Sequence, residues 1–474
     1  MQEHDIAENQ EEKIDEAEAT PAEDDHAYGL NDAVIRAIAP LIEAEASNEA
    51  LALLRELEPV DIAELIEKSS ADLRGKILDL MDRKIHPEAY THIDHELATS
   101  ILSQMRPKQV SFIINHLESD DALDLVRDLD EEFKDEILKT LSRRLRIIVE
   151  EGLTFPEDSA GRLMQREMVS IPQFWTVGKA VDYLRSASET LPSDFYDIFV
   201  IDPLYHFVGK LPISKILRSE RDVQIIDLLN EDSGYSVPAE MDQEEVTFLF
   251  RRHALISAPV VDENNRLIGM ITVDDIVDVI DEEAEEDMLK MGGVANDDIY
   301  RAALSTAKSR FSWLAVNLLT AIAASLVIGL FEATIQEVVA LAVLMPIVAS
   351  MGGNAGTQTL TVAVRALATK DLSSANAYQI VGKEFLVGVI NGLLFAIIMG
   401  LIAWLWFDHL MLGAVIAAAM VFNLMVAGFA GVIIPLTLHK FDMDPALSSA
   451  VFLTTITDIL GFFAFLGMAA WLLL

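Results

Sequence analysis

The chain of 474 residues contains no cysteine. Disulfide bonds and thiolate metal sites are therefore excluded, and the composition suits a reducing cytosol. The sequence also lacks the local motifs of several enzyme classes, since it has no P-loop, no H-E-x-x-H and no G-x-S-x-G. The protein is accordingly predicted not to be an enzyme.

Positive charge is scarce as well. The chain has 35 Lys and Arg residues against 76 Asp and Glu, a net charge of −41. From residue 311 onward there are four basic and eight acidic residues, so the first 310 residues carry a net charge of −37. Such an acidic segment repels nucleic acid and anionic lipid, and its natural partners are cations. The opening residues, M-Q-E-H-D-I-A-E, lack an apolar run, so a secretory signal is not expected.

Large apolar residues are nearly absent from residues 1–30, which are predicted to form an acidic disordered tail. From residue 31 to 160, apolar residues recur every three or four positions in short runs separated by Pro or Asp. This pattern predicts an acidic N-terminal domain of short helices stacked as a superhelix. Its acidic side chains form either an ordinary solvated surface or a cation-binding face; the positions concerned are Glu88, Asp120, Asp121, Asp124 and Asp128.

Residues 161–282 change to a mixed α/β pattern, and they do so twice. Each copy is predicted as strand–helix–strand–strand–helix, at a spacing of roughly 65 residues. The duplication resembles a pair of cystathionine-β-synthase (CBS) domains, which sense nucleotides or ions rather than catalyse. The run P-V-V-D-E-N-N-R-L-I-G-M-I-T in the second copy carries this resemblance best.

Directly after the second copy, the stretch from Asp281 to Asp287 holds six acids and one Ala. A helix here would suffer repulsion between like charges three and four residues apart, which a bound divalent cation would relieve. A solvated charge run explains the block equally well. Residues 283–310 are expected to form a connecting helix that leads into the membrane.

Five apolar segments follow, each long enough to cross a bilayer: about 312–331, 335–365, 384–406, 411–438 and 446–474. The Lys and Arg residues of the connecting loops all fall on one side, the side of the acidic N-terminal domains. An α-helical transmembrane domain of five spans over residues 311–474 is therefore predicted, with the N-terminus cytosolic and the C-terminus outside.

Polar residues interrupt the second and the fifth apolar segment. The run from Pro346 to Gln358, P-I-V-A-S-M-G-G-N-A-G-T-Q, has three glycines that let another backbone approach closely or let the helix loosen. Asn354 and Thr357 add oxygen atoms, and Asp458 in T-T-I-T-D-I-L-G is the one ionisable residue of the last segment. Polar groups at membrane depth indicate an ion pathway. Oxygen ligands with no Cys or His nearby suit a hard cation such as magnesium.

Taken in this order, the features resemble the MgtE family of magnesium channels, from about residue 31 to the end. The resemblance rests on the domain order, on G-G-N-x-G-x-Q, and on the runs R-A-L-A-T-K-D-L, D-P-A and T-T-I-T-D. It implies a homodimer in membrane lipid, with a cation pore at the subunit interface. It also implies that magnesium binds acidic cytosolic surfaces and closes the pore through a connecting "plug" helix.

The resemblance assigns roles position by position. Asp458 matches the acidic residue that holds the pore cation, and Asn354 matches its polar partner, with Thr454, Thr357 and Gly353 as further candidates beside them. The regulatory magnesium ions match acidic positions in the CBS pair, the connector and the N-terminal domain, namely Asp275, Asp278, Glu244, Glu283, Glu286, Asp287, Glu88, Asp120 and Asp124.

Two places depart from the family pattern. Ala254 stands where a regulatory Asp occurs in a well-studied type of member, so one regulatory site is expected to be weakened or lost. Ala450 and Val451 stand where a small residue followed by Pro is frequent. That difference concerns the local geometry before Asp458 and not the ion site itself.

The hypothesis is a magnesium-selective channel of the bacterial inner membrane, gated by cytosolic magnesium, that mediates magnesium influx and homeostasis. The CBS pair makes ATP a further candidate ligand. One alternative is a CBS-regulated secondary transporter that exchanges a divalent cation for protons or sodium. Another is a membrane-anchored sensor that carries no ions. No nucleic-acid partner is expected.

Overall fold

The computed structural model describes residues 30, 38, 40–42, 47–81, 85–187, 191–192, 194–230, 234–294, 303–373, 375–441 and 443–474. The predicted acidic tail lies outside these residues except for Leu30. The chain divides into two compact units, the first formed by Met1–Glu157 with Met164–Met168 and the second by Asp158–Leu163 with Val169–Leu474. The predicted fold class is confirmed: a helical N-terminal part, a duplicated α/β part and long apolar helices follow one another along the chain.

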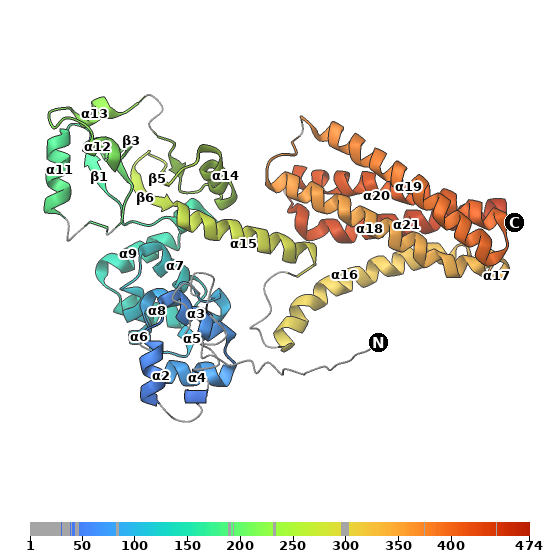
Figure 1. Cartoon of the computed structure of the whole chain (residues 1–474), viewed down its shortest axis with the longest axis horizontal. Coiled ribbons are helices and arrows are strands. Elements are labelled where there is room, and N and C mark those ends of the chain that lie inside the picture. The colour runs from blue at the N-terminus through green and yellow to red at the C-terminus, as the bar shows by residue number, and fades with distance from the viewer. Residues whose placement is uncertain are drawn as a thin grey trace, which may run out of the picture. The chain divides into compact units, whose positions relative to one another are not determined.

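The first unit is a stack of short helices (Figure 1). Local sequence signals explain where several of them begin: Pro107 opens α6, and the side chain of Ser70 caps α4. Their apolar faces meet in a core that includes Leu54, Leu65 and Ile77. The bounds are α2 (Ser47–Leu54), α3 (Pro59–Lys68), α4 (Ala71–Leu80), the 3-10 helix η2 (Pro87–Tyr90), α5 (His95–Ser103), α6 (Pro107–Ile114), α7 (Ser119–Arg127), α8 (Glu131–Thr140) and α9 (Arg143–Gly152).

The second unit begins with two copies of one α/β arrangement. Each copy has a three-stranded sheet whose first strand runs parallel, and whose third strand runs antiparallel, to the central strand. The registers correspond, with Val200 opposite Gly209 in one copy and Val260 opposite Gly269 in the other. The predicted duplication is therefore confirmed. The elements are α10 (Ala160–Leu163), β1 (Ser170–Pro172), α11 (Val177–Ser186), β2 (Asp197–Ile201), β3 (Phe207–Pro212), α12 (Ile213–Leu217), α13 (Ile225–Leu228), β4 (Val237–Pro238), α14 (Gln243–His253), β5 (Ser257–Val261) and β6 (Leu267–Thr272).

An ion pair within the first copy, formed by Lys210 and Asp197, joins the two copies through hydrogen bonds with Ser257 of the second. Lys210 Nζ lies 2.8 Å from Asp197 Oδ2 and donates a second hydrogen bond to the Ser257 carbonyl at 2.8 Å. Ser257 Oγ donates to the same Asp197 oxygen at 2.8 Å. Both charges thus have hydrogen-bonding partners, which a buried ion pair needs to offset its loss of hydration. The two copies are thereby held together as one module.

The last helix of the second copy extends well beyond it. α15 (Val273–Met291) runs without a break through the acidic stretch from Asp281 to Asp287. The boundary expected between residues 282 and 283 therefore falls inside one helix. Residues 295–302, in the predicted connecting segment, lie outside the described residues.

In the described part of the chain, five helices are long and apolar enough to cross a membrane. They are α16 (Ala303–Gly329), α18 (Ala340–Ala368), α19 (Ala377–Phe407), α20 (Leu410–Lys440) and α21 (Pro445–Leu472). The second of them begins at residue 340 and not near 335 as predicted. A separate short helix, α17 (Glu332–Glu337), ends at Val338, whose φ of −125° and ψ of 80° are not helical.

α20 lies at the centre of the membrane part, where it packs against α18, α19 and α21 (Figure 1). Its contact with α19 is especially close, because glycines face backbone atoms across the interface. A Cβ atom added to Gly388 would lie 2.5 Å from the carbonyl oxygen of Leu424, and one added to Gly413 would lie 2.5 Å from that of Gly400. Small residues of this kind let membrane helices approach backbone to backbone.

Gly388→Ala is expected to destabilise the membrane part, because the added methyl group would overlap a backbone oxygen that cannot rotate away. Overpacking of this kind costs about 1–3 kcal/mol. The matched control is Gly382→Ala in the same helix, where an added Cβ meets no atom within 4 Å. Thermal unfolding of the full chain in detergent measures both. Equal melting temperatures for the two variants would contradict the close α19–α20 contact.

Candidate functional site

The glycine-rich motif lies in α18, which is helical throughout. Its three glycines divide between two faces. Gly352 and Gly356 are buried, and Cβ atoms added to them would lie 2.2 Å from Asn423 Nδ2 and 2.9 Å from Leu453. A Cβ atom added to Gly353 would meet no atom within 4 Å. Two of the glycines therefore serve close helix packing, and the motif does not interrupt the helix.

The face of α18 that includes Gly353 is the polar one. Asn354 and Thr357 are exposed in the single chain. Thr357 Oγ1 donates to the Gly353 carbonyl at 2.9 Å, and Asn354 Nδ2 donates to Ser350 Oγ at 3.4 Å. These bonds use donors, so the Asn354 and Thr357 side-chain oxygens keep lone pairs for a cation. At membrane depth such a face requires water or protein against it.

Asp458 lies half-buried on α21, about one helical turn beyond Thr454. Thr454 Oγ1 donates to the carbonyl of Ala450 at 3.0 Å, so its lone pairs also stay available. Within the described part of the chain, the Asp458 carboxylate makes no hydrogen bond and no ion pair. Pairing with a neighbouring helix, the structural alternative to an ion-binding role, therefore has no support in these residues.

The two helices that carry Asn354 and Asp458 pack directly against each other. Their contact includes Leu453 of α21 seated on Gly356 of α18. Among the described residues, no hydrogen bond joins Asn354 to Asp458, although their helices are neighbours.

Sequence reasoning missed two polar residues inside the apolar helices. Glu384 on α19 is only 9% exposed, and its Oε2 accepts a hydrogen bond from Thr359 Oγ1 at 3.3 Å. Asn423 on α20 is completely buried and donates to the Val348 carbonyl at 2.8 Å. Asn423 is a lone polar residue in an apolar run, which is a readable signal, whereas Glu384 follows Lys383, whose Nζ lies 3.5 Å from Glu384 Oε1. The predicted third span begins at Glu384, whereas α19 begins at Ala377.

Several of the predicted regulatory residues form an acidic cluster between α14 and α15. Partial burial, then the carboxylates of Glu283, Asp242 and Asp287, raise the pKa of Glu244 to about 7. Burial also raises the pKa of Glu283. A hydrogen bond of 2.6 Å that Gln243 Nε2 donates to Glu283 Oε1 opposes this change. Glu244 of α14 thus interacts with two further predicted regulatory residues, Glu283 and Asp287 of α15. Their mutual repulsion is what a hard cation would relieve.

Glu286 pairs with a basic side chain and not with the acidic cluster. Lys290 Nζ lies 2.6 Å from Glu286 Oε1 and 2.8 Å from Asp444 Oδ2. Although burial opposes the charge, these two carboxylates raise the pKa of Lys290. The other oxygen of Asp444 caps α21 by accepting from the Ala446 amide at 2.8 Å. Lys290, which the sequence did not single out, therefore links the end of α15 to the start of the helix that carries Asp458.

Asp275 has a local role in addition to its predicted regulatory one. Its Oδ2 accepts hydrogen bonds from the Thr272 hydroxyl at 2.6 Å and from the Thr272 amide at 3.1 Å, which makes a capping box at the start of α15. Burial nevertheless raises the pKa of Asp275 to about 6, with Asp274 and Asp278 adding repulsion. Asp275 and Asp278 therefore form a separate acidic pair, one turn apart on α15.

The N-terminal candidates do not gather at one point. Glu88 faces His86 across 3.6 Å. Asp124 lies 3.4 Å from His95 Nδ1 and 3.0 Å from Arg127, and although burial opposes it, these contacts lower the pKa of Asp124. Asp120 Oδ1 accepts from the Asp121 amide at 2.9 Å. An ordinary network of charged surface residues thus accounts for Asp124, while its role in cation sensing stays a prediction.

Among the residues that the structure describes, no group of three or more His, Asp or Glu side chains is arranged as a ready-made metal site. The residues of the acidic cluster lie along two helices, with Glu244 on α14 and with Glu283 and Asp287 on α15, and do not form such a group. Magnesium dehydrates reluctantly and keeps several waters, so it is commonly held by one or two carboxylates. The donor set therefore fits a hydrated divalent cation better than a cage of protein ligands.

A second contact joins the CBS pair to the membrane part, between α14 and the loop after α18. Lys370 Nζ lies 4.7 Å from the Phe248 ring centroid and 3.7 Å from Glu245 Oε1. Arg251 Nη2 donates to the Thr369 carbonyl at 3.5 Å. The helix that carries Glu244 therefore also touches the end of the helix that carries the glycine-rich motif.

Ala254, which stands where the family resemblance places a regulatory Asp, ends α14 in the left-handed conformation with a φ of 48°. The neighbouring His253 stacks on Tyr235 with ring centroids 4.0 Å apart. The local structure around this departure is thus that of a helix end. Loss of a regulatory site at Ala254 remains a prediction.

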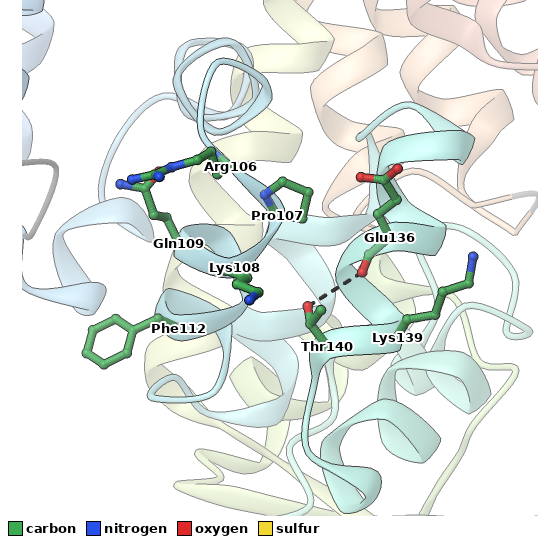
Figure 2. Close-up of a pocket in the computed structure, with 8 residues that line it drawn as sticks. All are labelled: Arg106, Pro107, Lys108, Gln109, Phe112, Glu136, Lys139 and Thr140. Carbon is green, nitrogen blue, oxygen red and sulfur yellow. Dashed lines mark hydrogen bonds between the residues drawn. The ribbon is translucent and has the colours of Figure 1, made fainter.

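The first unit also holds a groove of about 800 Å³ between α6 and α8, shown in Figure 2. None of the predicted site residues lines it. Its lining combines basic and apolar side chains with one acid, namely Arg106, Pro107, Lys108, Gln109, Phe112, Glu136, Lys139 and Thr140. The groove is therefore separate from the candidate cation sites.

Comparison with known families matches three parts of the chain. Residues 345–468 match a family described as MgtE, divalent cation transporter, and residues 57–158 match the MgtE intracellular N domain. Residues 227–282 match the CBS domain, which covers the second copy only. These matches follow the order of parts that the sequence predicts.

Several curated relatives are similar over most of their length. "Magnesium transporter MgtE" of Bacillus subtilis is 31% identical over 88% of this chain and 92% of its own. The protein of the same name from Thermus thermophilus is 31% identical over 89% of this chain and 94% of its own. A solved structure described as the soluble part of a magnesium transporter is 27% identical and covers 53% of this chain and 99% of its own, with a TM-score of 0.46.

The acidic cluster predicts how stability depends on pH. The pKa of Glu244, about 7 in the folded protein, exceeds its ordinary value of 4.5. The folded state therefore binds more protons between these values, and its stability falls as the pH rises through that window. The melting temperature of the magnesium-free full chain should thus drop between about pH 5 and about pH 8.

Glu244→Gln should make that drop smaller, because an amide does not titrate. Glu240→Gln, a change at an exposed acid just before α14, serves as the control and should leave the drop as in the wild type. Magnesium added at the higher pH should raise the melting temperature more in the wild type than in Glu244→Gln. An unaltered pH dependence in Glu244→Gln would disprove the cluster.

Proposed function

The chain belongs to the MgtE family of divalent cation transporters, and from this premise we propose that it is a magnesium-selective channel gated by cytosolic magnesium. It admits magnesium down its electrochemical gradient across a bacterial inner membrane, with the N-terminal domains in the cytosol. We also propose that it works as a homodimer and that ATP binds the CBS pair, the latter on the type of module alone.

The observation that carries the proposal is the Asp458 carboxylate, which lies half-buried on an apolar helix with no partner in the described residues. A charge at membrane depth is expensive and occurs mainly where it serves an ion or proton pathway. Asn354 and Thr357 present free oxygen lone pairs on the neighbouring helix. In a homodimer, two Asp458 charges on the symmetry axis would balance one divalent ion, and neutral oxygens would contact its hydration shell.

Gating is proposed to arise from the acidic cluster of Glu244, Glu283 and Asp287. At low cytosolic magnesium these carboxylates repel one another, which favours separation of the elements that carry them. Magnesium binds the compact arrangement better and shifts the equilibrium towards it. The contact of Lys290 with Asp444 supports this route, since it ties the sensing helix α15 to the start of α21.

A specific observation supports one alternative. Glu384 is a second buried carboxylate within a long apolar helix, and buried carboxylates form the proton relays of pumps and transporters. The alternative function is therefore a secondary transporter that exchanges a divalent cation for protons. It shares the magnesium substrate and the Asp458 site with the channel proposal, and it differs in its energy source.

The first experiment is patch-clamp recording from membranes that contain the full chain, with magnesium on the cytosolic side stepped from micromolar to about 10 mM. Asp458→Asn keeps the side-chain shape and removes the charge, so we expect the magnesium current to fall by about tenfold or more. Asp408→Asn, at the α19–α20 turn, makes the same chemical change outside the pathway and should conduct like the wild type.

Either result has a definite meaning. Equal currents in the two variants would remove Asp458 from the pathway. Absence of current in the wild type, together with magnesium uptake that depends on a proton gradient, would favour the exchange transporter. In that case Glu384→Gln should abolish the dependence on pH.

The gating proposal predicts a change in magnesium sensitivity. The double variant Glu244→Gln with Glu283→Gln removes two charges from the acidic cluster, so a higher cytosolic magnesium concentration should be needed to close the current. Magnesium should also protect the cytosolic part of this variant less well against protease. Glu240→Gln is the control for both measurements. Wild-type closure and protection in the double variant would show that magnesium is sensed elsewhere.

A further inference from the structure

Asn423 is a buried amide in the middle of an apolar helix. It has no exposed surface, and the neighbouring residues of α20 that are also buried include Ala419, Met420 and Leu424. Its Nδ2 donates to the Val348 carbonyl of α18 at 2.8 Å, while its Oδ1 has no hydrogen-bond partner in the described part of the chain. Burying a polar atom without a partner is costly, so this amide is not explained by the hydrophobicity of its site.

The amide is held between two glycines from two other helices. A Cβ atom added to Gly352 of α18 would lie 2.2 Å from Asn423 Nδ2. One added to Gly461 of α21 would lie 2.8 Å from the same nitrogen and 3.0 Å from Oδ1. The distances of 2.2 Å and 2.8 Å to Nδ2 are shorter than a real Cβ atom tolerates. The absence of a side chain at each glycine therefore makes room for this one amide.

Both glycines lie next to the candidate pore residues in sequence. Gly352 precedes Asn354 by two residues on α18, and Gly461 follows Asp458 by three residues on α21. Three residues are nearly one helical turn. A single side chain of α20 thus touches α18 and α21 at the level where each carries its polar group. The separation of Asn354 and Asp458 depends on what fills this space.

We infer that Asn423 is a positioning residue that fixes the spacing of α18 and α21 at the ion pathway and so contributes to the choice of cation. The inference rests on the proposed transport function. A leucine of similar size would fill the same space with no unpaired oxygen. The amide adds one directional bond to the Val348 carbonyl, which holds α20 and α18 in a single register. Small misplacements of ligands matter strongly for a hydrated ion that fits a fixed site.

The test compares Asn423→Leu with Asn317→Leu. Asn317 on α16 also donates to a backbone carbonyl, but within its own helix, at 3.2 Å from the Trp313 oxygen. We expect Asn423→Leu to change the ratio of magnesium to calcium permeability by about tenfold in a protein that still folds. Asn317→Leu should leave the ratio unchanged. Asn423→Thr, which keeps a donor, should lie closer to the wild type.

A second variant approaches the same contact from α21. Gly461→Ala leaves Asn423 in place and pushes against its amide, so it should also change the permeability ratio. If these variants fold and all keep the wild-type ratio, the positioning role is wrong. If Asn423→Leu and Gly461→Ala both fail to give a folded protein, Asn423 serves stability alone and the inference is overturned. Absence of any wild-type current would instead overturn the channel proposal, and the same ratio would then be measured as calcium competition against magnesium uptake.

Discussion

The cost of an unpaired polar group in hydrocarbon governs the membrane part of this protein. Most hydroxyl groups in the described apolar helices avoid this cost locally, as Thr357 and Thr454 do when they donate to carbonyls of their own helices. Glu384 avoids it by accepting a hydrogen bond from Thr359 of a neighbouring helix, and Asn423 avoids it for its Nδ2 only. The carboxylate of Asp458 does neither within the described residues. Its position in an apolar helix is therefore costly, and the proposed cation would offset that cost by binding the carboxylate.

Charged residues of α14 and α15 contact the apolar part of the chain at two places. Lys290, near the end of α15, pairs with Asp444, which caps α21, and α14 touches the loop that follows α18. Each of the two helices with a polar motif is thus attached at one end to the CBS pair. Any change in repulsion between α14 and α15 therefore acts on elements in direct contact with α18 and α21. These contacts provide a physical route that couples the acidic cluster to α18 and α21. The gating measurements test whether the protein has two states that this route connects.

The sequence predicts most of the fold, because hydrophobic period and length are local properties. The duplicated α/β pattern and the five long apolar helices follow from them. A local signal also existed for Asp275, since T-x-x-D before an apolar run is a capping box. The close contact around Asn423 could not be predicted in this way. It depends on Gly352 and Gly461, which are 109 residues apart and meet only when three helices pack.

The site shows the same limit. The residue types that suit a hard cation were identified from the sequence, but the partners of each side chain were not. Glu286 bonds to Lys290, and Asp124 bonds to His95 and Arg127, whereas Glu244 is repelled by Glu283 and by Asp287. Helical spacing places acids on a face, and only tertiary packing determines which of them are neutralised by a basic side chain. The same packing determines which face of the glycine-rich motif is buried against other helices and which face is left open.

The tight turn between α19 and α20 has a consequence for how the protein is made. Only Asp408 and His409 separate the two helices, and glycines hold them backbone to backbone from Gly388 near one end to Gly413 near the other. Such a pair can leave the translocon together as a helical hairpin. α20 would then have a protein neighbour on one side from the moment of its insertion. The remaining side would stay open until α21, which follows α20 along the chain, closes over Asn423.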